Sequence, residues 1–400
     1  MTQDVFIYDA IRTPRGKGKP GGGLHEVKPI DLVVNQLNAL RLRNSLDTSL
    51  VEDLILATGE PVDEQGQNLA KAAITYADWS DATTGAQLHR FCAGGLDAVN
   101  LAFAKIAAGI ESLNCAGGVE SMSRLGIGAS GGAVSDPWVA WQSDFVPQGV
   151  AADLIANLND FDREQLDTYG VLSQARATQA QTNGHFRSLV PVVDMNGVTI
   201  LNRDETIRPQ TTAEGLADLS PVFESYGALG YDELIKFKYP QIASLRHHHT
   251  QGTSSGIADG AALVLLGNQQ AGKQLSIEPR ARIVATALVG TEPTIMLCGP
   301  APAARKALAQ ADLNIEDIDL FEVNEAFASV VLLFAKELEL PMDKINVNGG
   351  AIAMGHPIGA TGAMLVGSLI DELERRQLRR GMVTLCAGGG IGIATIIERV

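Results

Sequence analysis

The tetrapeptide Cys-Ala-Gly-Gly occurs three times in the chain, beginning at Cys92, Cys115 and Cys386. In each half of the chain, a glycine-rich loop is followed by an amphipathic helix and then by an apolar strand that ends in this tetrapeptide. A unit of loop, helix and strand that recurs within one chain is typical of an internal duplication. The repeat therefore predicts two similar halves of α/β architecture.

Two of the three copies stand where a reactive thiol would be useful. Cys92 directly precedes a helix, and Cys386 ends an apolar strand that leads into three consecutive glycines. The apolar stripe of that helix consists of Leu96, Val99, Phe103, Ile106 and Ile110. A small residue and glycines beside a thiol let another group approach the sulfur and let backbone N–H groups point at a developing charge. Both segments thus have the local plan of a reactive site.

The composition is that of an ordinary globular protein, because 46% of the 400 residues are hydrophobic and 19% are charged. A formal net charge of −15 argues against nucleic-acid binding, which favours a basic surface. Four cysteines do not make a disulfide framework in a chain this long, and the first residues lack the features of a signal peptide. The longest strongly apolar stretch, at 328–335, is less than half of the roughly 20 residues that span a bilayer. We therefore expect a cytoplasmic protein without a transmembrane segment.

The pattern along the chain predicts three regions. Residues 1–123 are expected to form the N-terminal half, rejoined by 253–277, and residues 278–400 the C-terminal half. Residues 124–252 contain prolines, glycines and fewer clean strand patterns, and we interpret them as an inserted domain. Its best helix is expected to begin at Asp162, with Gln165 completing a capping box. The other expected elements are strands at 5–8, 318–323, 345–348, 382–386 and 391–397, a buried segment at 51–57, and helices at 31–40, 301–311 and 325–338.

Residues 236–249 form the clearest basic stretch, with Lys236, Lys238, Arg246 and three consecutive histidines. Adjacent residues cannot all point at one ion, and no cysteine or carboxylate stands at a suitable spacing nearby. The sequence thus disfavours a metal site here and favours a solvated surface or the rim of a ligand site.

Four residues are candidates for chemistry, and each has a structural alternative. Cys92 at a helix start is expected to have a lowered thiol pKa, which suits a nucleophile, although a buried cysteine can also act as a small apolar residue. His356, held in a turn by the proline that follows, is either a base for a thiol or a surface residue. Cys386 either exchanges a proton or is structural. Asn324 either fixes a water or an oxyanion, or caps the following helix.

Together, the motifs of the chain resemble the thiolase family over nearly its whole length. They are Arg12-Thr-Pro, Gly117-Gly-Val-Glu-Ser-Met-Ser, Ser255-Gly-Ile-Ala-Asp-Gly-Ala, Asn324-Glu-Ala-Phe-Ala, Asn348-Gly-Gly-Ala-Ile-Ala-Met-Gly, His356-Pro-Ile-Gly-Ala-Thr-Gly and Cys386-Ala-Gly-Gly-Gly. The resemblance implies a thiolase fold, in which two duplicated βαβαβαββ halves form a five-layered α-β-α-β-α arrangement with an inserted loop domain that covers coenzyme A (CoA). Two segments, Leu24-His-Glu-Val-Lys-Pro and Phe145-Val-Pro-Gln, resemble in particular bacterial thiolases that form the β subunit of a trifunctional fatty-acid oxidation enzyme.

The resemblance also implies a covalent mechanism. His356 would take the proton of Cys92, whose sulfur attacks the 3-keto carbon of a 3-ketoacyl-CoA, and Cys386 would protonate the leaving enolate and deprotonate the incoming CoA. His356 with a water held by Asn324 would form one oxyanion site. The backbone N–H groups of Cys92 and Gly388 would form the other.

Further residues are placed by the same resemblance. Ser255 matches a family serine that contacts the pantetheine arm of CoA, and its alternative is a turn residue that leads into a strand. Cys115 matches no catalytic thiol of the family and is assigned to packing. CoA is implied as a substrate, and neither a permanently bound cofactor nor a metal is implied. A homodimer or homotetramer is expected, with an α subunit that carries hydratase and dehydrogenase activities as a conceivable partner.

The leading function is therefore 3-ketoacyl-CoA thiolase in fatty-acid β-oxidation. The alternatives are an acetyl-CoA acetyltransferase and, in another class, a non-catalytic lipid-binding or scaffold subunit. Decarboxylating synthases of the same fold generally pair the nucleophile with two histidines, so Cys386 disfavours them. Two departures bear on this function: Gly94 stands where the family commonly has serine, and Pro147-Gln148 stands near where the short-chain biosynthetic branch carries a His-Met pair. The second departure favours medium or long acyl chains.

Overall fold

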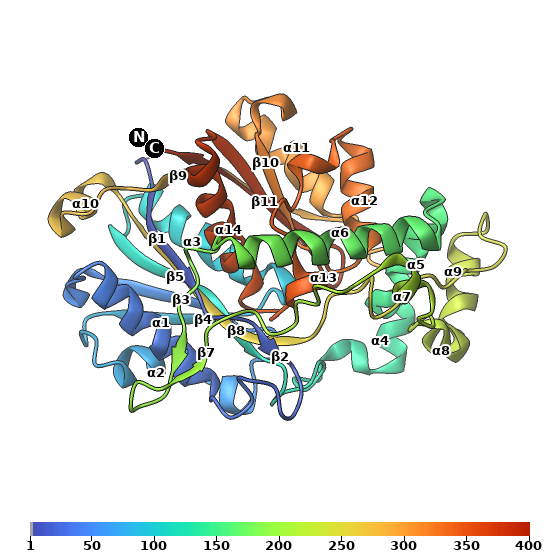
Figure 1. Cartoon of the computed structure of the whole chain (residues 1–400), viewed down its shortest axis with the longest axis horizontal. Coiled ribbons are helices and arrows are strands. Elements are labelled where there is room, and N and C mark those ends of the chain that lie inside the picture. The colour runs from blue at the N-terminus through green and yellow to red at the C-terminus, as the bar shows by residue number, and fades with distance from the viewer. Residues whose placement is uncertain (1–2) are drawn as a thin grey trace.

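The structure is a computed structural model that describes residues 3–400, and its elements alternate strand and helix in both halves of the chain (Figure 1). The N-terminal half contains β1 (Phe6–Arg12), β2 (Gly16–Lys17), α1 (Pro29–Arg43), β3 (Asp53–Ala57), α2 (Leu69–Tyr76), β4 (Thr84–Leu88), α3 (Gly94–Ala107), β5 (Leu113–Ser121) and, after the middle region, β8 (Ala258–Gly267). The C-terminal half contains β9 (Ala281–Gly290), α11 (Pro300–Ala311), β10 (Leu320–Val323), α12 (Ala328–Glu337), α13 (Ala351–Met354), α14 (Thr361–Arg376), β11 (Arg380–Ala387) and β12 (Ile391–Arg399). The short helix α10 (Gln269–Leu275) connects β8 to β9.

The middle region is mainly helical. It contains α4 (Pro137–Gln142), α5 (Gln148–Asn159), α6 (Arg163–Thr182), β6 (Val192–Val193), β7 (Thr199–Leu201), α7 (Ala213–Ala217), α8 (Glu224–Tyr226) and α9 (Asp232–Lys238). The predicted capping box is confirmed at the start of α6, where Asp162 and Gln165 each accept the other's backbone N–H through their side chains. Figure 1 shows α6 crossing in front of the two halves.

The order of strands in the large sheet confirms the predicted duplication. The order is β10-β11-β12-β9-β1-β8-β5-β3-β4, and β9 pairs with β1 where the two halves meet. Read outward from that junction, the N-terminal half runs β1-β8-β5-β3 and the C-terminal half runs β9-β12-β11-β10, so corresponding strands occupy corresponding places. In each half, the last two strands in sequence are antiparallel neighbours: β5 with β8, and β11 with β12. The pairs farther from the junction, β3 with β5 and β10 with β11, are parallel.

Five layers result from this arrangement. Helices α3 and α14 pack against each other between the two halves of the sheet, and each contacts strands from both halves. Helices α1 and α2 cover the outer face of the N-terminal strands, and α11 covers the outer face of the C-terminal strands and contacts α12 (Figure 1). Alternate residues of β11 therefore face different cores: Val383 and Leu385 contact the central layer, whereas Met382 and Cys386 face the outer one.

The prediction of a strand at 345–348 is wrong. Only Ile345 makes a bridge, to Phe321 of β10, because the next residue, Asn346, has a left-handed φ of 47° that turns the chain away from the sheet. The Asn346 side chain takes over the pairing, since its Oδ1 accepts the N–H of Val323 at 2.7 Å and its Nδ2 donates to the carbonyl of Val323 at 2.8 Å. The C-terminal half thus keeps the duplicated plan with its third strand reduced to one bridge.

Two smaller corrections concern helices. The predicted helix at 325–338 begins at Ala328, because residues 324–326 belong to no helix or strand and Phe327, in extended conformation, is the N-cap. In the apolar stripe of α3, Leu96, Val99 and Ile106 are buried as predicted, but Ile110 lies beyond the end of the helix and is exposed.

Within residues 3–400, no helix is long and apolar enough to cross a membrane.

Candidate active site

Cys92 lies in a short 3-10 turn, Phe91–Ala93, that leads directly into α3. Phe91 has a left-handed φ of 46°, a conformation that costs a bulky residue on the order of 1–3 kcal/mol and that often occurs at functional sites. The turn contacts β11, so the strained backbone delivers the thiol to the strand that carries Cys386. Gly94 packs closely at this entry, because a Cβ there would lie 3.0 Å from Cβ of Ala57 at the end of β3.

The expectation of a lowered pKa for Cys92 is wrong for the free protein. Burial raises the pKa of its thiol to about 12, and the charge of Glu120 adds to the increase. Three groups oppose this effect: the N–H of Cys92 itself, the side-chain amide of Gln148 and the N–H of Gly388. The helix start supplies donors, but desolvation outweighs them, so Cys92 is a neutral thiol at pH 7 and needs a base.

His356 lies in the loop between α13 and α14 with its ring in a defined tautomer. Its Nδ1 lies 2.7 Å from Oγ1 of Thr361, and this hydroxyl itself donates to the carbonyl of Pro357 at 2.9 Å. Because the hydroxyl proton is already used, Thr361 accepts from Nδ1–H, which leaves Nε2 unprotonated, with its lone pair as an acceptor. Burial lowers the pKa of His356 to about 3, with a smaller contribution from the charge of Arg15. The ring is therefore a neutral proton acceptor.

The His356 loop is fixed by a second contact. The N–H of His356 donates to the carbonyl of Gly256 at 2.8 Å. Gly355 has a φ of 93°, and a Cβ there would lie 2.6 Å from Cβ of Ala258, so only glycine suits this position.

Asn324 follows the last residue of β10 and is buried beside His356. Its Nδ2 donates to Nε2 of His356 at 3.4 Å, and its backbone N–H donates to the carbonyl of Thr384 on β11. It does not cap a helix, because α12 begins four residues later with Phe327 as its N-cap. Among the described residues, its buried Oδ1 has no hydrogen-bond partner, which leaves an acceptor for a water or a ligand.

Cys386 is fully buried near the end of β11. Burial and the nearby Cys92 sulfur both raise the pKa of its thiol. Two residues later, Gly388 leaves little room for a side chain: a Cβ there would lie 3.2 Å from Nε2 of Gln148 and 3.7 Å from the ring of Phe91. The structure thus brings the two thiols, the N–H of Gly388 and the turn of Cys92 into one place.

Ser255 lies in the segment that holds these loops together. Its N–H donates to the carbonyl of Ala326, and Ser254 forms a bridge with Phe327. With the carbonyl of Gly256 bound to His356, this segment joins the Asn324 and His356 loops just before β8 begins.

Cys115 lies apart from this site. It is fully buried in β5, on the outer core of the N-terminal half, and burial alone raises the pKa of its thiol to about 12.

Two buried glutamates that the sequence analysis did not single out position the loops of the site. Glu120 accepts the N–H groups of Gly59 at 2.5 Å and Gly359 at 2.8 Å, so it ties the His356 loop to the end of β3. Glu325 accepts from Tyr169 and Ser173 of α6, at 2.7 Å each, and from the N–H of Ile352. The only signal in the sequence is their type, because a carboxylate at the end of an apolar strand needs partners when it is buried.

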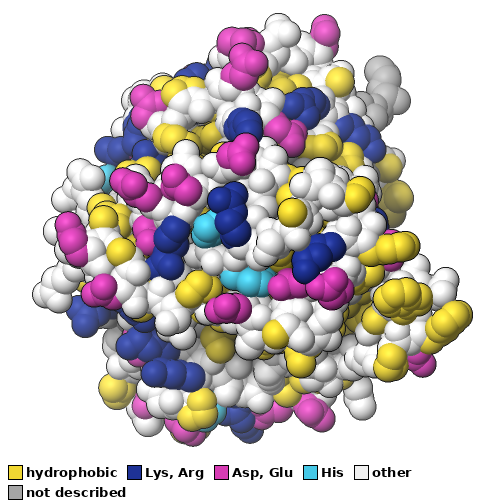
Figure 2. All heavy atoms as spheres, turned by 90° about the vertical axis from the view of Figure 1, so that its right-hand side faces the viewer, with side chains coloured by type: hydrophobic (Ala, Val, Ile, Leu, Met, Phe, Trp, Pro, Cys, Tyr) yellow, Lys and Arg dark blue, Asp and Glu magenta, His cyan; other side chains and the backbone are white. Residues whose placement is uncertain are grey.

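The stretch 236–249 differs from the expected solvated or rim surface. His247 and His249 are buried, and both direct Nδ1 at the carboxylate of Asp153, at 2.8 and 2.7 Å. The lysines are paired with acids: Lys236 contacts Glu233, and Lys238 contacts Asp144 and Glu292. Figure 2, which views the end of the molecule on the right of Figure 1, shows basic and acidic side chains interspersed there without a large basic patch.

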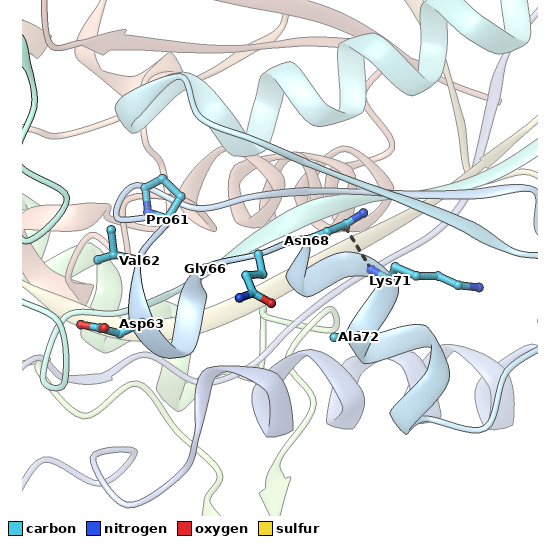
Figure 3. Close-up of a pocket in the computed structure, with 8 residues that line it drawn as sticks. Pro61, Val62, Asp63, Gly66, Asn68, Lys71 and Ala72 are labelled. Atoms are coloured by element: carbon cyan, nitrogen blue, oxygen red, sulfur yellow. Dashed lines mark hydrogen bonds between the residues drawn. The ribbon is translucent and has the colours of Figure 1, made fainter.

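A surface cavity of about 1240 Å³ lies elsewhere, between Pro61–Gly66 and the start of α2 (Figure 3). Asn68 caps α2 there by accepting the N–H of Lys71 at 3.2 Å. None of the predicted site residues lines this cavity, and its walls carry neither a thiol nor an imidazole. The chemistry therefore points to the buried thiols and not to this cavity.

A thiol at a strained turn, a neutral imidazole, a second thiol and converging N–H groups are what acyl transfer through cysteine requires. Comparison with known families gives the same class. Residues 5–230 match the model of the thiolase N-terminal domain, and residues 277–399 match that of the thiolase C-terminal domain. The chain belongs to the thiolase family and is a CoA-dependent acyltransferase.

Curated relatives and solved structures cover the whole chain. A 3-oxoadipyl-CoA/3-oxo-5,6-dehydrosuberyl-CoA thiolase of Escherichia coli K12 is 38% identical, and a 3-ketoacyl-CoA thiolase of Cronobacter sakazakii is 37% identical, each over 100% of both chains. The crystal structure of human mitochondrial 3-ketoacyl-CoA thiolase matches with a TM-score of 0.87 at 32% identity, covering 100% of this chain and 99% of that one. The acetyl-CoA acetyltransferase of Bacillus anthracis matches with a TM-score of 0.85 at 34% identity and the same coverage.

Proposed function

We propose that the protein is a 3-ketoacyl-CoA thiolase, which cleaves a 3-ketoacyl-CoA with CoA to give acetyl-CoA and an acyl-CoA shortened by two carbons. The observation that carries this proposal is the convergence of two buried thiols, Cys92 and Cys386, at a turn that contacts α14, the helix that follows the loop of His356, whose unprotonated Nε2 can accept a proton. One thiol is needed to carry the acyl group. The other is needed to exchange protons with carbon and with CoA.

In the first half-reaction, the Cys92 sulfur attacks the 3-keto carbon while Nε2 of His356 takes the thiol proton. Because the pKa of Cys92 is about 12 and that of His356 about 3, a free thiolate–imidazolium pair is disfavoured, so proton transfer accompanies attack. The C2–C3 bond then breaks, the acyl group stays on Cys92, and the acetyl-CoA enolate takes a proton from Cys386. The free Oδ1 of Asn324 can hold a water against the enolate oxygen.

In the second half-reaction, the Cys386 thiolate takes the proton of an incoming CoA thiol. The CoA sulfur attacks the thioester carbon, and the N–H groups of Cys92 and Gly388, which already face the Cys92 sulfur, stabilise the oxyanion. Cys92 leaves with the proton held by His356, and the enzyme returns to its starting state. Run in reverse, the same steps form a carbon–carbon bond.

The acylation step can be tested with an acyl-CoA as donor, followed by mass mapping of the acylated peptide. We expect label on Cys92 in the wild type and none in Cys92→Ser, which should also lose thiolysis. Cys115→Ala is the matched control, because Cys115 is a buried thiol in the same tetrapeptide, and it should keep the label on Cys92. Full thiolysis by Cys92→Ser would refute the mechanism, and an unlabelled wild type would favour a non-catalytic subunit.

We propose an apolar 3-ketoacyl chain as the substrate in β-oxidation. An aromatic cluster of Phe223, Phe327 and His249 adjoins Gly149, beside Gln148 and the Asn324 loop, which favours an apolar acyl or pantetheine group. The names of several relatives support a second candidate, a 3-oxoadipyl-CoA with a terminal carboxylate. A third is acetoacetyl-CoA. Comparing kcat/KM for 3-ketohexadecanoyl-CoA, 3-oxoadipyl-CoA and acetoacetyl-CoA decides, and a preference for either of the last two would overturn the first assignment.

We further propose that residues 124–252 form a loop domain over CoA, and that 1–123 with 253–277 and 278–400 are the two halves. Ser255, three residues after the loop domain, is proposed to contact the pantetheine arm of CoA. A cytoplasmic homodimer or homotetramer is also proposed. The partly exposed edge strand β4 supports it, since it offers unpaired backbone groups to another chain. Co-purification from the native host tests this assembly, and it also tests an α subunit with hydratase and dehydrogenase activities.

A further inference from the structure

Gln148 is the first residue of α5, at the point where the middle region enters the site. Pro147 precedes it in extended conformation and gives α5 no side-chain cap, so the entry to this helix does not require the Gln148 amide. The side chain is only partly buried, whereas the following residues of α5 are packed in the core. Its amide is therefore carried by a helix that is anchored in the core.

The amide of Gln148 lies against the backbone of the candidate active site. Its Nε2 would lie 3.2 Å from a Cβ on Gly388, so it lies against the backbone that follows Cys386. It also faces the Cys92 sulfur, together with the N–H groups of Cys92 and Gly388. Among the hydrogen bonds between residues 3–400, no other group occupies the Gln148 side chain.

We propose that the Gln148 side-chain amide is a further catalytic hydrogen-bond donor, which joins the N–H groups of Cys92 and Gly388 around the Cys92 sulfur and the oxyanion of its thioester. A carboxamide donor is suitable for this task, because it is neutral and its N–H bonds can be aimed at a charge that develops in a buried site. The inference rests on the proposed role of Cys92 as the acyl carrier.

The same contact has a consequence for the thiol before substrate binds. Donors that face a sulfur stabilise its thiolate, so Gln148 lowers the pKa of Cys92 against the opposing effect of burial. Removal of the amide should thus affect both the turnover and the ease with which the free thiol ionises. A residue with a purely structural role would not change the second property.

The test compares wild type, Gln148→Met and Gln142→Met in the full chain. Methionine keeps the length of glutamine and removes the donor, and Gln142 is an exposed glutamine at the end of α4 that serves as the control. Because a hydrogen bond to a charged acceptor is involved, we expect kcat for thiolysis to fall by about 10- to 150-fold in Gln148→Met, with KM near the wild-type value. The pH profile of Cys92 alkylation by iodoacetamide should shift to higher pH.

A kcat for Gln148→Met within about twofold of the wild type overturns the proposal, and so does a lower kcat with an unchanged alkylation profile. Gln142→Met should match the wild type in both measurements. Cys92→Ser separates the two levels of inference. If Cys92→Ser keeps full thiolysis, the proposed function fails. If Cys92→Ser is inactive and Gln148→Met is normal, only the role of Gln148 fails.

Discussion

Thr361→Val should remove the constraint that keeps His356 in its reactive tautomer. In the structure, Nδ1–H donates to Oγ1 of Thr361 at 2.7 Å, and the free Nε2 lies 3.4 Å from Nδ2 of Asn324. Valine has nearly the same shape but no acceptor. The imidazole must then either leave a buried N–H without a partner or move its proton to Nε2, where the free Oδ1 of Asn324 offers an acceptor after rotation of the amide. Either outcome weakens the base.

The magnitude follows from the lost hydrogen bond. A buried donor without a partner costs about 1–3 kcal/mol, which corresponds to a fall in kcat of about 5- to 150-fold if it applies to the reactive tautomer. KM should change little, because Thr361 lies behind the imidazole. Steady-state thiolysis measures kcat, and nitrogen-15 NMR of the histidines reads the tautomer.

Thr395→Val is the matched control for this substitution. Thr395 is a fully buried threonine on β12 whose hydroxyl donates to Asn100 at 2.7 Å, so its loss should lower stability by a similar amount without a change in kcat. If Thr361→Val destabilises the protein as much as Thr395→Val and yet keeps kcat and the His356 tautomer, the argument about the proton on Nδ1 is refuted.

Three further predictions concern charge and packing. Because the pKa of Cys92 is raised to about 12, its alkylation rate in the free enzyme should rise about tenfold per pH unit between pH 7 and 10, and a plateau near pH 8 would contradict this. Since the pKa of His356 falls to about 3 on folding, its contribution to stability is complete above about pH 6.5 and is lost toward pH 3. In denaturant titrations, the free energy of unfolding should therefore fall less steeply between pH 6.5 and pH 3 for His356→Gln than for wild type. Glu120→Gln should lower the free energy of unfolding by about 2–4 kcal/mol, because its amide N–H would face two donors whichever way the amide is turned: the N–H groups of Gly59 and Gly359, or the N–H of Glu60 and the side-chain amide of Gln65. Glu214→Gln, at an exposed position of α7, should be neutral.

Much of the fold was predictable from local patterns, because the periodicity of apolar residues survives in the structure. The capping box at Asp162 and the helix after Cys92 are examples. The strand expected at 345–348 failed for a reason that periodicity does not encode, since Asn346 adopts a left-handed φ and pairs through its side chain. The apolar pattern of a short segment predicts a strand, but it does not show where the chain turns away. Here the turn depends on the hydrogen bonds between Asn346 and Val323 of β10.

The sequence singled out residues that lie together at the candidate active site, but it predicted their physical state only in part. Helix starts lower thiol pKa values, and this local argument gave the wrong direction for Cys92 because burial is a property of the assembled layers. The partners that set the chemistry lie far apart in sequence: Thr361 fixes the His356 tautomer from the next helix, and Gln148 reaches Gly388 from the middle region. Single-residue patterns carry no information on such pairs.

The copies of Cys-Ala-Gly-Gly at Cys115 and Cys386 differ because their strands end at different places, whereas the copy at Cys92 lies in a turn before α3. After Cys115, β5 continues to Ser121, so the thiol lies in mid-strand, and its glycines make room for close backbone contacts: a Cβ on Gly118 would collide with the carbonyl of Gly359 in the His356 loop. After Cys386, β11 ends at Ala387, so the glycines form an open turn. The first set of glycines thus admits the His356 loop, and the second set forms a turn without side chains beside the two buried thiols. The two copies therefore fill complementary parts of the candidate active site.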